Sequence, residues 1–264
     1  MRRGNVDLKI VPTTPFHTDL SWLRQRAPEL VSRLTRSPAK ADLWLSSGWP
    51  ARAARPLCHK WALRVDWEYG AIPQDMTPHV SEDADLVVVH SEFVYRSIKA
   101  AGRPMPSIKV VPHGIDEAMM GMAKPAERVL QFKGDRPAVL FCGGLIWRKG
   151  FDVFLSSVLA ARSAGHDFVV VVKGLGAGQH YGNFNLAGLL DRFRKTPGTP
   201  DVLLIDDELP REELASIYTA CDVMVHPYRG EGFCMPVFDA RACGLPALPT
   251  RGGATERHIL GPSA

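Results

Sequence analysis

The sequence predicts an α/β protein built on parallel β-sheets. Short, continuous, valine-rich apolar runs recur along the chain, as expected for strands that are buried on both faces. Helical patterns lie between these runs, which is typical of βαβ units with right-handed crossovers. The chain has 264 residues, of which 45% are hydrophobic and 23% charged, so it is long enough for two α/β domains of modest size.

The predicted elements alternate in order along the chain. Strands are expected at residues 86–89, 138–142, 168–172, 202–205 and 223–225. Helices are expected at residues 150–164, 211–220 and 236–243. The stretch 116–136 breaks the sheet pattern, and we interpret it as the connection between two domains, 1–117 and 118–264.

The segment from His226 to Thr250 carries the strongest chemical signal. Glu231 lies in a glycine-flanked loop, and Pro236 stands where its fixed φ suits the first turn of a helix. Asp239 follows within that helix, whose N-terminal N–H groups and dipole favour an anion. Carboxylates beside such an anion can accept hydrogen bonds from hydroxyl groups. The pattern therefore predicts a nucleotide-sugar site, and its alternative is an ordinary strand–turn–helix junction with two solvated carboxylates.

This segment resembles the donor-site signature of the retaining glycosyltransferases of family 4, in the GT-B group. The signature is Glu, seven residues and Glu, followed by a small-residue helix and Cys-Gly-x-Pro. Here it reads Glu231 to Asp239 and then Cys243-Gly-Leu-Pro246. Further segments fall in family order, namely 111–116, 141–152, 206–222 and 252–256. The resemblance covers most of residues 64–258.

The resemblance implies a GT-B fold of two Rossmann-like domains whose parallel sheets face a central cleft. Both domains look incomplete relative to the family, because no glycine-rich loop is evident near the start and the sequence stops soon after Glu256. Residues 1–117 would form the acceptor-side domain, and residues 118–264 the nucleotide-sugar donor domain.

The implied reaction moves a sugar from a nucleotide-diphosphate donor, UDP- or GDP-linked, to an acceptor hydroxyl with retention of configuration. The acceptor would be a glycan, a lipid-linked molecule or a small molecule. No permanently bound cofactor and no metal are expected. Two alternatives stay open: a nucleotide-sugar 2-epimerase of the same fold, and a non-catalytic or partner-dependent remnant of such an enzyme.

The resemblance also assigns roles to residues. Lys149 would hold the diphosphate, Glu231 the hydroxyls of the donor sugar, and Asp239 the ribose hydroxyls. Glu68 would face the acceptor, where a carboxylate can orient or deprotonate a hydroxyl, unless it only hydrogen-bonds the following turn. The other expected donor-site residues are Gly143, Gly144, Arg148, Lys173, Gly232, Phe233, Cys234, Met235 and His113. For His113, packing at the domain junction is favoured over phosphate contact, because no partner for acid–base work is visible.

The signature departs from the family at several positions. Gly144 stands where the family has arginine, and Arg148 is the expected substitute. Cys234 replaces a glycine and would be strained if that position needs a positive φ. We expect it to pack under the loop as a small hydrophobe and not to act as a nucleophile. Asp239 is one methylene shorter than the usual glutamate, and Arg241 is expected to pair with it in competition with ribose.

Charge and cysteine content narrow the partners and the compartment. A net charge of +4 suits an anionic substrate or an acidic membrane surface and is too small to indicate nucleic acid. Five cysteines without metal-type spacing indicate a reducing, cytoplasmic setting. No apolar run approaches the roughly 18 residues of a membrane span. The basic amino terminus fits peripheral contact with the cytoplasmic membrane face about as well as a solvated surface.

Overall fold

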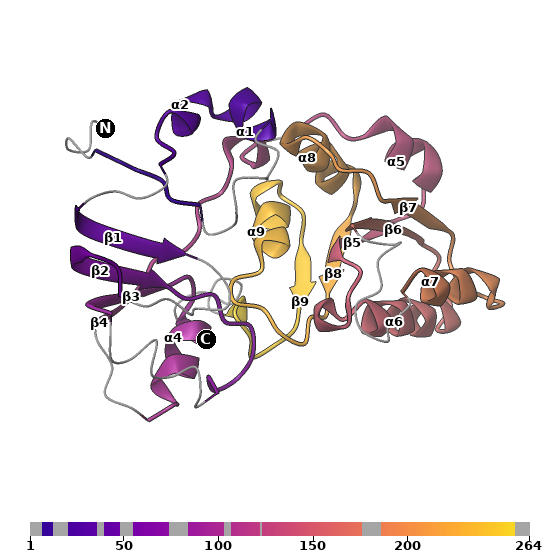
Figure 1. Cartoon of the computed structure of the whole chain (residues 1–264). Coiled ribbons are helices and arrows are strands. Elements are labelled where there is room, and N and C mark those ends of the chain that lie inside the picture. Colours follow the sequence, from indigo (N-terminus) through magenta and orange to yellow (C-terminus); the bar gives the residue numbers. More distant parts are fainter. Residues whose placement is uncertain are drawn as a thin grey trace. The chain divides into compact units, whose positions relative to one another are not determined.

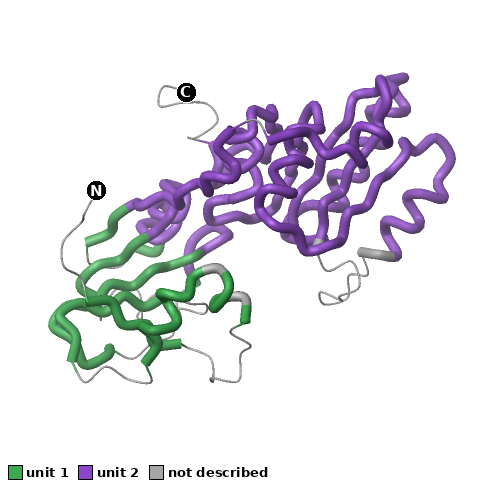
Figure 2. Tube along the Cα trace, turned by 90° about the horizontal axis from the view of Figure 1, so that it is seen from above, with its two compact units in different colours: residues 1–66, 73–88, 101–109 green, residues 67–72, 89–100, 110–264 purple. Residues whose placement is uncertain are grey.

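The protein, seen here as a computed structural model, consists of two compact units (Figures 1 and 2). Unit 1 comprises residues 1–66, 73–88 and 101–109, and unit 2 comprises residues 67–72, 89–100 and 110–264. The structure describes residues 7–12, 21–35, 40–47, 55–73, 84–102, 107–121, 123–175 and 186–256.

Unit 1 holds most of a four-stranded sheet in the order β1-β2-β3-β4. The strands are β1 (Ala41–Ser47), β2 (Cys58–Arg64), β3 (Leu86–Val89) and β4 (Ser107–Val110), preceded by helices α1 (Ser21–Arg26) and α2 (Pro28–Val31). β2 pairs in parallel with both β1 and β3. Asp85 fixes the start of β3 by accepting hydrogen bonds from Trp61 N–H at 2.9 Å and Lys60 Nζ at 3.0 Å. These bonds hold the pKa of its carboxyl well below the usual range.

Unit 2 is built on a five-stranded parallel sheet in the order β7-β6-β5-β8-β9. Its strands are β5 (Ala138–Gly144), β6 (Val169–Leu175), β7 (Val202–Ile205), β8 (Val223–His226) and β9 (Ala247–Pro249). The first strand along the chain, β5, lies in the middle, and the chain winds outward from it in both directions. This is the doubly wound order, in which ligands bind at the carboxyl ends of the two strands where the direction reverses. Here those strands are β5 and β8.

Helices cover both faces of this sheet (Figure 1). Alternate strand residues point to opposite faces, so Leu140 and Val171 pack on one side while Phe141 and Val170 pack on the other. The first face is covered by α5 (Glu127–Lys133), α8 (Arg211–Ala220) and α9 (Met235–Ala242). The second face is covered by α6 (Phe151–Ser163) and α7 (Leu186–Lys195). Unit 2 also contains α4 (Glu92–Lys99) and the 3₁₀ turns η1 (Glu117–Met119) and η2 (Trp147–Lys149).

The predicted α/β class with two parallel sheets is confirmed. Each predicted strand and helix is present, with bounds that differ from the expected ones by at most three residues. The stretch 116–136 contains η1 and α5 and, among its described residues, no strand. The expected helix 236–243 is α9, which begins and ends one residue earlier. None of the helices in the described part of the chain has the length and apolarity needed to cross a bilayer.

Candidate functional site

Two loops meet at the carboxyl ends of β5 and β8. The loop after β5 contains η2, and the loop after β8 runs into α9. Gly150 allows their approach: it has a φ of 70°, and a Cβ built on it would lie 1.9 Å from the carbonyl oxygen of Pro227. A hydrogen bond from Arg229 N–H to the carbonyl oxygen of Arg148 (2.8 Å) joins the loops directly. The site therefore depends on backbone contact that only glycine permits at position 150.

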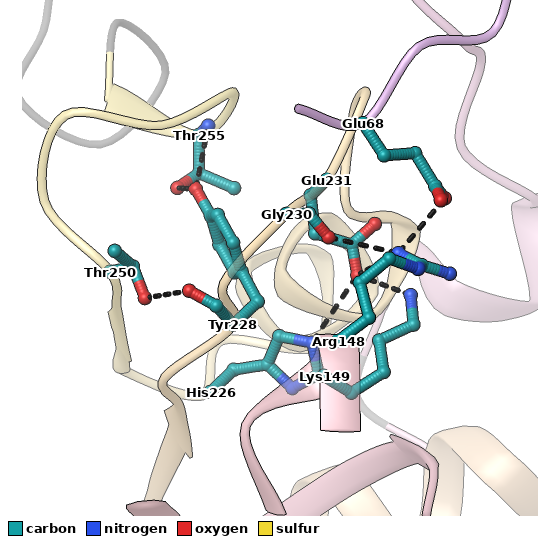
Figure 3. Close-up of polar contacts among 9 residues, drawn as sticks. All are labelled: Glu68, Arg148, Lys149, His226, Tyr228, Gly230, Glu231, Thr250 and Thr255. Atoms are coloured by element: carbon teal, nitrogen blue, oxygen red, sulfur yellow. Dashed lines mark hydrogen bonds and ion pairs between the residues drawn. The ribbon is translucent and has the colours of Figure 1, made fainter. Parts of the chain in front are cut away.

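Lys149 and Glu231 form a buried ion pair between these loops (Figure 3). Lys149 Nζ donates a hydrogen bond to Glu231 Oε1, and Arg148 Nη1 lies 3.6 Å from the same oxygen. Burial raises the pKa of Glu231, but neighbouring His226, Lys149 and Arg148 outweigh it, so the pKa lies below its usual value. The carboxylate is therefore ionised at neutral pH. The structure brings these three predicted site residues together.

Arg148 also connects the site to the segment 67–72. Its Nη1 lies 2.9 Å from Glu68 Oε1 and donates to the carbonyl oxygen of Gly230 at 2.9 Å (Figure 3). The segment packs tightly on the loop after β8, because a Cβ on Gly230 would lie 2.4 Å from the carbonyl oxygen of Glu68. Gly232 makes a similar approach, with its would-be Cβ 2.7 Å from the carbonyl oxygen of Trp67. Glu68 is thus held beside Arg148.

His226, the last residue of β8, is fully buried behind Glu231. Its Nε2 lies 3.7 Å from Glu231 Oε1, and within the described residues neither ring nitrogen has a hydrogen-bond partner. Burial lowers the pKa of the imidazole, and the charges of Lys149 and Arg148 act in the same direction, against the effect of Glu231. The ring is therefore neutral at neutral pH. His226, Glu231 and Cys234 offer metal-ligating atoms within 4.8 Å of one another, but the ammonium of Lys149 already supplies positive charge at Glu231.

The loop after β8 is anchored by a serine and by aromatic rings. Ser91 caps α4, its Oγ accepting from Val94 N–H, and donates to the carbonyl oxygen of Gly232 at 2.6 Å. Phe233 stacks on Phe238 with ring centroids 4.2 Å apart. His113 stacks on His90 at 3.6 Å and meets Phe233 edge-on at 5.0 Å. His113 therefore packs against two rings beside this loop.

Cys234 adopts the left-handed conformation immediately before α9. Its φ of 70° and ψ of 62° place it in a region that costs a non-glycine residue about 1–2 kcal/mol. The strain foreseen at this position is therefore present. The side chain is buried, and burial raises the pKa of the thiol well above its usual value. α9 begins at the next residue, Met235, so the first N–H groups of the helix and its positive dipole end lie here.

Asp239 lies on α9 and pairs with an arginine that the sequence analysis did not select. Arg211 Nη1 donates to Asp239 Oδ2 at 3.2 Å, and Arg211 Nε lies 3.5 Å from Asp116 Oδ2. The expected pairing with Arg241 is wrong, because residues two apart on a helix do not face each other. Burial raises the pKa of Asp239, Asp116 adds to the rise and Arg211 opposes it. Among the described residues, Asp239 Oδ1 has no hydrogen-bond partner.

The remaining predicted residues lie at the ends of β5 and β6. Gly143 lies against His226, with its would-be Cβ 3.1 Å from the ring carbon Cε1, and Gly144 is the last residue of β5. Lys173 does not follow the strand as expected, because β6 continues to Leu175. It is buried, and its Nζ donates to the carbonyl oxygen of Gly174 at 3.2 Å.

Several residues that shape the site were not predicted from the sequence. His226 and Arg211 are the direct neighbours of the two key carboxylates. Arg229 forms a two-pronged ion pair with Asp152, which holds the loop after β8 against α6. Tyr228 points away from Glu231 and shares a 2.8 Å hydrogen bond with Thr255 (Figure 3). Of these residues, only Arg211 could have been selected from the sequence. It stands at the start of a predicted helix, where a cation opposes the helix dipole and needs an anionic partner.

The chain is similar in sequence to known glycosyltransferases. Residues 136–261 match the family model described as Glycosyl transferases group 1. A GDP-mannose-dependent alpha-(1-6)-phosphatidylinositol monomannoside mannosyltransferase of Mycolicibacterium smegmatis is 23% identical over 256 residues, covering 88% of this chain and 65% of that protein. A D-inositol 3-phosphate glycosyltransferase of an Arthrobacter species is 30% identical over 155 residues, covering 58% of this chain and 36% of that protein. The chain thus spans less than two thirds of the length of these relatives.

Solved structures share the fold. Sucrose-phosphate synthase from Thermosynechococcus elongatus superposes with a TM-score of 0.58 at 18% identity, over 75% of this chain and 51% of that one. A glycosyltransferase from Rickettsia africae gives a TM-score of 0.57 at 16% identity, over 76% and 54%. At these identities the likeness concerns the α/β fold with its two parallel sheets.

Proposed function

We propose that this chain transfers a sugar from a nucleotide-diphosphate donor to an acceptor hydroxyl with retention of configuration. One observation carries the proposal: Lys149 and Arg148 converge on Glu231 at the carboxyl ends of β5 and β8, next to the start of α9. In a doubly wound sheet this is where ligands bind. Cations, the N–H groups at the start of a helix and a carboxylate at one such point suit a diphosphate that carries a sugar.

Lys149 would hold the diphosphate, with Arg148 beside it and the N–H groups of Phe233, Cys234 and Met235 at the start of α9. A lysine ammonium has three N–H donors, so Lys149 can bind phosphate without releasing Glu231. As the bond between the anomeric carbon and the diphosphate breaks, negative charge grows on the leaving oxygen, and these groups stabilise it. The acceptor oxygen forms the new bond to that carbon, and its proton passes to an oxygen of the departing diphosphate.

The carboxylates would bind the hydroxyl groups around this centre. Glu231 is ionised and buried, so it is a strong acceptor for hydroxyls of the donor sugar. Asp239 would accept from the ribose. Glu68, paired with Arg148, would orient the acceptor hydroxyl. Gly143, Gly144 and Gly232 would contribute backbone groups to the donor site, and Lys173 would add positive charge near the carboxyl end of β6. His113 would support Phe233, which it meets edge-on.

The relatives narrow the choice of donor and acceptor. The mannosyltransferase named above depends on GDP-mannose and acts on a phosphatidylinositol mannoside, and the other relative acts on an inositol phosphate. GDP-mannose is therefore the first donor to test, followed by UDP-sugars, with inositol phosphates and lipid-linked polyols as acceptors. We place the protein in the cytoplasm, at the membrane face where the acceptor is a lipid, with residues 1–117 and 118–264 as its two domains.

The proposal is tested by binding first and turnover second. GDP and UDP are titrated into the chain by calorimetry, and GDP-mannose or UDP-sugars are then incubated with and without acceptor. We expect nucleotide release that depends on acceptor, and a product whose anomeric configuration by NMR matches the donor. Glu231→Gln should spare nucleotide affinity and depress transfer. Release without acceptor and with inversion at C2 would indicate an epimerase, and no nucleotide binding would contradict the proposal.

A further inference from the structure

Arg211 occupies an unusual place for a cation. It is the first residue of α8, where the helix dipole is positive and repels a guanidinium. Two carboxylates compensate: Asp239 Oδ2 lies 3.2 Å from Nη1, and Asp116 Oδ2 lies 3.5 Å from Nε. Arg211 therefore joins the turn before η1, the start of α8 and the buried face of α9.

Asp116 fixes this cluster from one side. Its Oδ1 accepts a hydrogen bond from Ala118 N–H at 3.1 Å, as the cap of η1, which leaves Oδ2 for Arg211. Asp116 thereby holds the guanidinium at Nε, and the Nη1 end of the guanidinium faces Asp239. A planar guanidinium held at one edge offers its remaining donors in fixed directions. The orientation of the Asp239 carboxylate thus follows from Arg211.

Asp239 itself is incomplete as a buried carboxylate. Its side chain is 4% exposed, and one of its two oxygens, Oδ1, is buried without a hydrogen-bond partner in the described part of the chain. A buried carboxylate oxygen left unpaired is unfavourable, so it is a place where a hydroxyl donor from a ligand would be gained. The only cation bonded to Asp239 among the described residues is Arg211.

We propose that Arg211 is a positioning residue for the nucleoside end of the donor. By holding Oδ2 of Asp239, it directs Oδ1 to accept a ribose hydroxyl. This fixes the orientation of the aspartate, whose side chain is one methylene shorter than the family's usual glutamate. This inference rests on the proposed function, because it needs a nucleotide in the site. Arg211 acts through Asp239 and has no direct role at the sugar being transferred.

The test compares ribonucleotides with nucleotides that lack the ribose hydroxyls. GDP and UDP, and their 2′,3′-dideoxy forms, are titrated by calorimetry into the wild-type chain and into Arg211→Ala. We expect Arg211→Ala to bind the ribonucleotide about tenfold more weakly than the wild type does, which is the effect of one good hydrogen bond. The dideoxy form should bind to Arg211→Ala and to the wild type with the same affinity. Arg241→Ala is the matched control: it removes the same charge from an exposed position on α9, and affinity should not change.

A second readout separates positioning from a loss of folding. Without the guanidinium, the pKa of Asp239 rises further, so ribonucleotide binding by Arg211→Ala should weaken at a higher pH than in the wild type. Asp239→Asn should lose as much affinity as Arg211→Ala, and the double variant should lose no more than either. Equal losses for ribo- and dideoxynucleotides, or additive losses in the double variant, would overturn the role of Arg211 while leaving the proposed function standing. Absence of all nucleotide binding by the wild type would overturn both.

Discussion

The ammonium of Lys149 is hydrogen-bonded to the carboxylate of Glu231, although the two residues are 82 positions apart. Their side chains are only 15% and 5% exposed, so each charge depends on the other. Removing one partner of a buried pair leaves the other uncompensated, whereas removing both charges together is often tolerated. The pair is therefore a structural contact as well as the proposed binding site for a diphosphate.

Lys149→Met should lower the free energy of unfolding by about 2–4 kcal/mol, because Glu231 stays buried without its main partner. Arg148, 3.6 Å away, limits the loss. Adding Glu231→Gln to this variant should restore part of the stability. Lys149→Met and the double variant should both bind GDP or UDP at least about tenfold more weakly than the wild type in calorimetry, since both lack a charge-assisted contact to phosphate.

Urea denaturation of the wild type, both single variants and the double variant measures the coupling between the two residues. Additive losses would mean that the ion pair contributes nothing specific to stability. Unchanged nucleotide affinity in Lys149→Met would contradict the role given to this lysine at the diphosphate.

Cys234 is the one described non-glycine residue with a positive φ, and it precedes the helix at the proposed donor site. Cys234→Gly and Cys234→Ala both remove the thiol, but only glycine adopts this conformation without strain. We expect the glycine variant to be more stable than the alanine variant by at least about 1 kcal/mol in chemical denaturation. Equal stabilities would show that the loop relaxes to a negative φ at this position.

Glycine is required at position 150 for two reasons, a positive φ and the close approach of another backbone segment. Its φ is +70°, and a Cβ there would lie 1.9 Å from the carbonyl oxygen of Pro227. Gly165, after α6, has a φ of +94° but no atom within 4 Å of its would-be Cβ. Gly165→Ala should therefore cost only about 1 kcal/mol of backbone strain, whereas Gly150→Ala should cost more than about 2 kcal/mol and weaken nucleotide binding. Similar losses in the two variants would mean that the loops are not in contact at Pro227.

The sheet of unit 2 was predictable because its strands are valine runs buried on both faces. β7 and α8 have the expected bounds. β1 and β2 escaped prediction because their patterns are mixed: Leu43 and Leu45 are 63% and 58% exposed, and the first half of β2 is polar. A continuous apolar run indicates a strand that is buried on both faces, whereas strands that are partly polar or partly exposed, such as these two, carry no such signal.

The sequence selected residues that the structure brings together, but it did not predict how they pair. Spacing and resemblance selected Lys149, Glu231 and Asp239, since the ends of parallel strands bring their loops to one edge of the sheet. The partner of Asp239 is Arg211, 28 positions away, and not nearby Arg241. Likewise, nothing in the sequence says that His226 faces Glu231, because the direction of a side chain at a strand end depends on the helices packed around it.

His226 predicts how stability depends on pH. Its pKa in the folded protein lies below the ordinary value of 6.5, because the ring is fully buried and adjoins Lys149 and Arg148. Below pH 6.5 the unfolded chain takes up a proton that the folded protein does not bind, so the free energy of unfolding falls as the pH falls. The slope contributed by one such group approaches about 1 kcal/mol per pH unit, and it vanishes above neutral pH.

We expect His226→Asn to remove this part of the slope between about pH 7 and 5.5 in urea denaturation, while the exposed control His166→Asn keeps it. If His226→Asn keeps the wild-type slope, the imidazole takes up its proton in the folded protein as in the unfolded chain, and Glu231 then has three cationic partners and a weaker hold on Lys149.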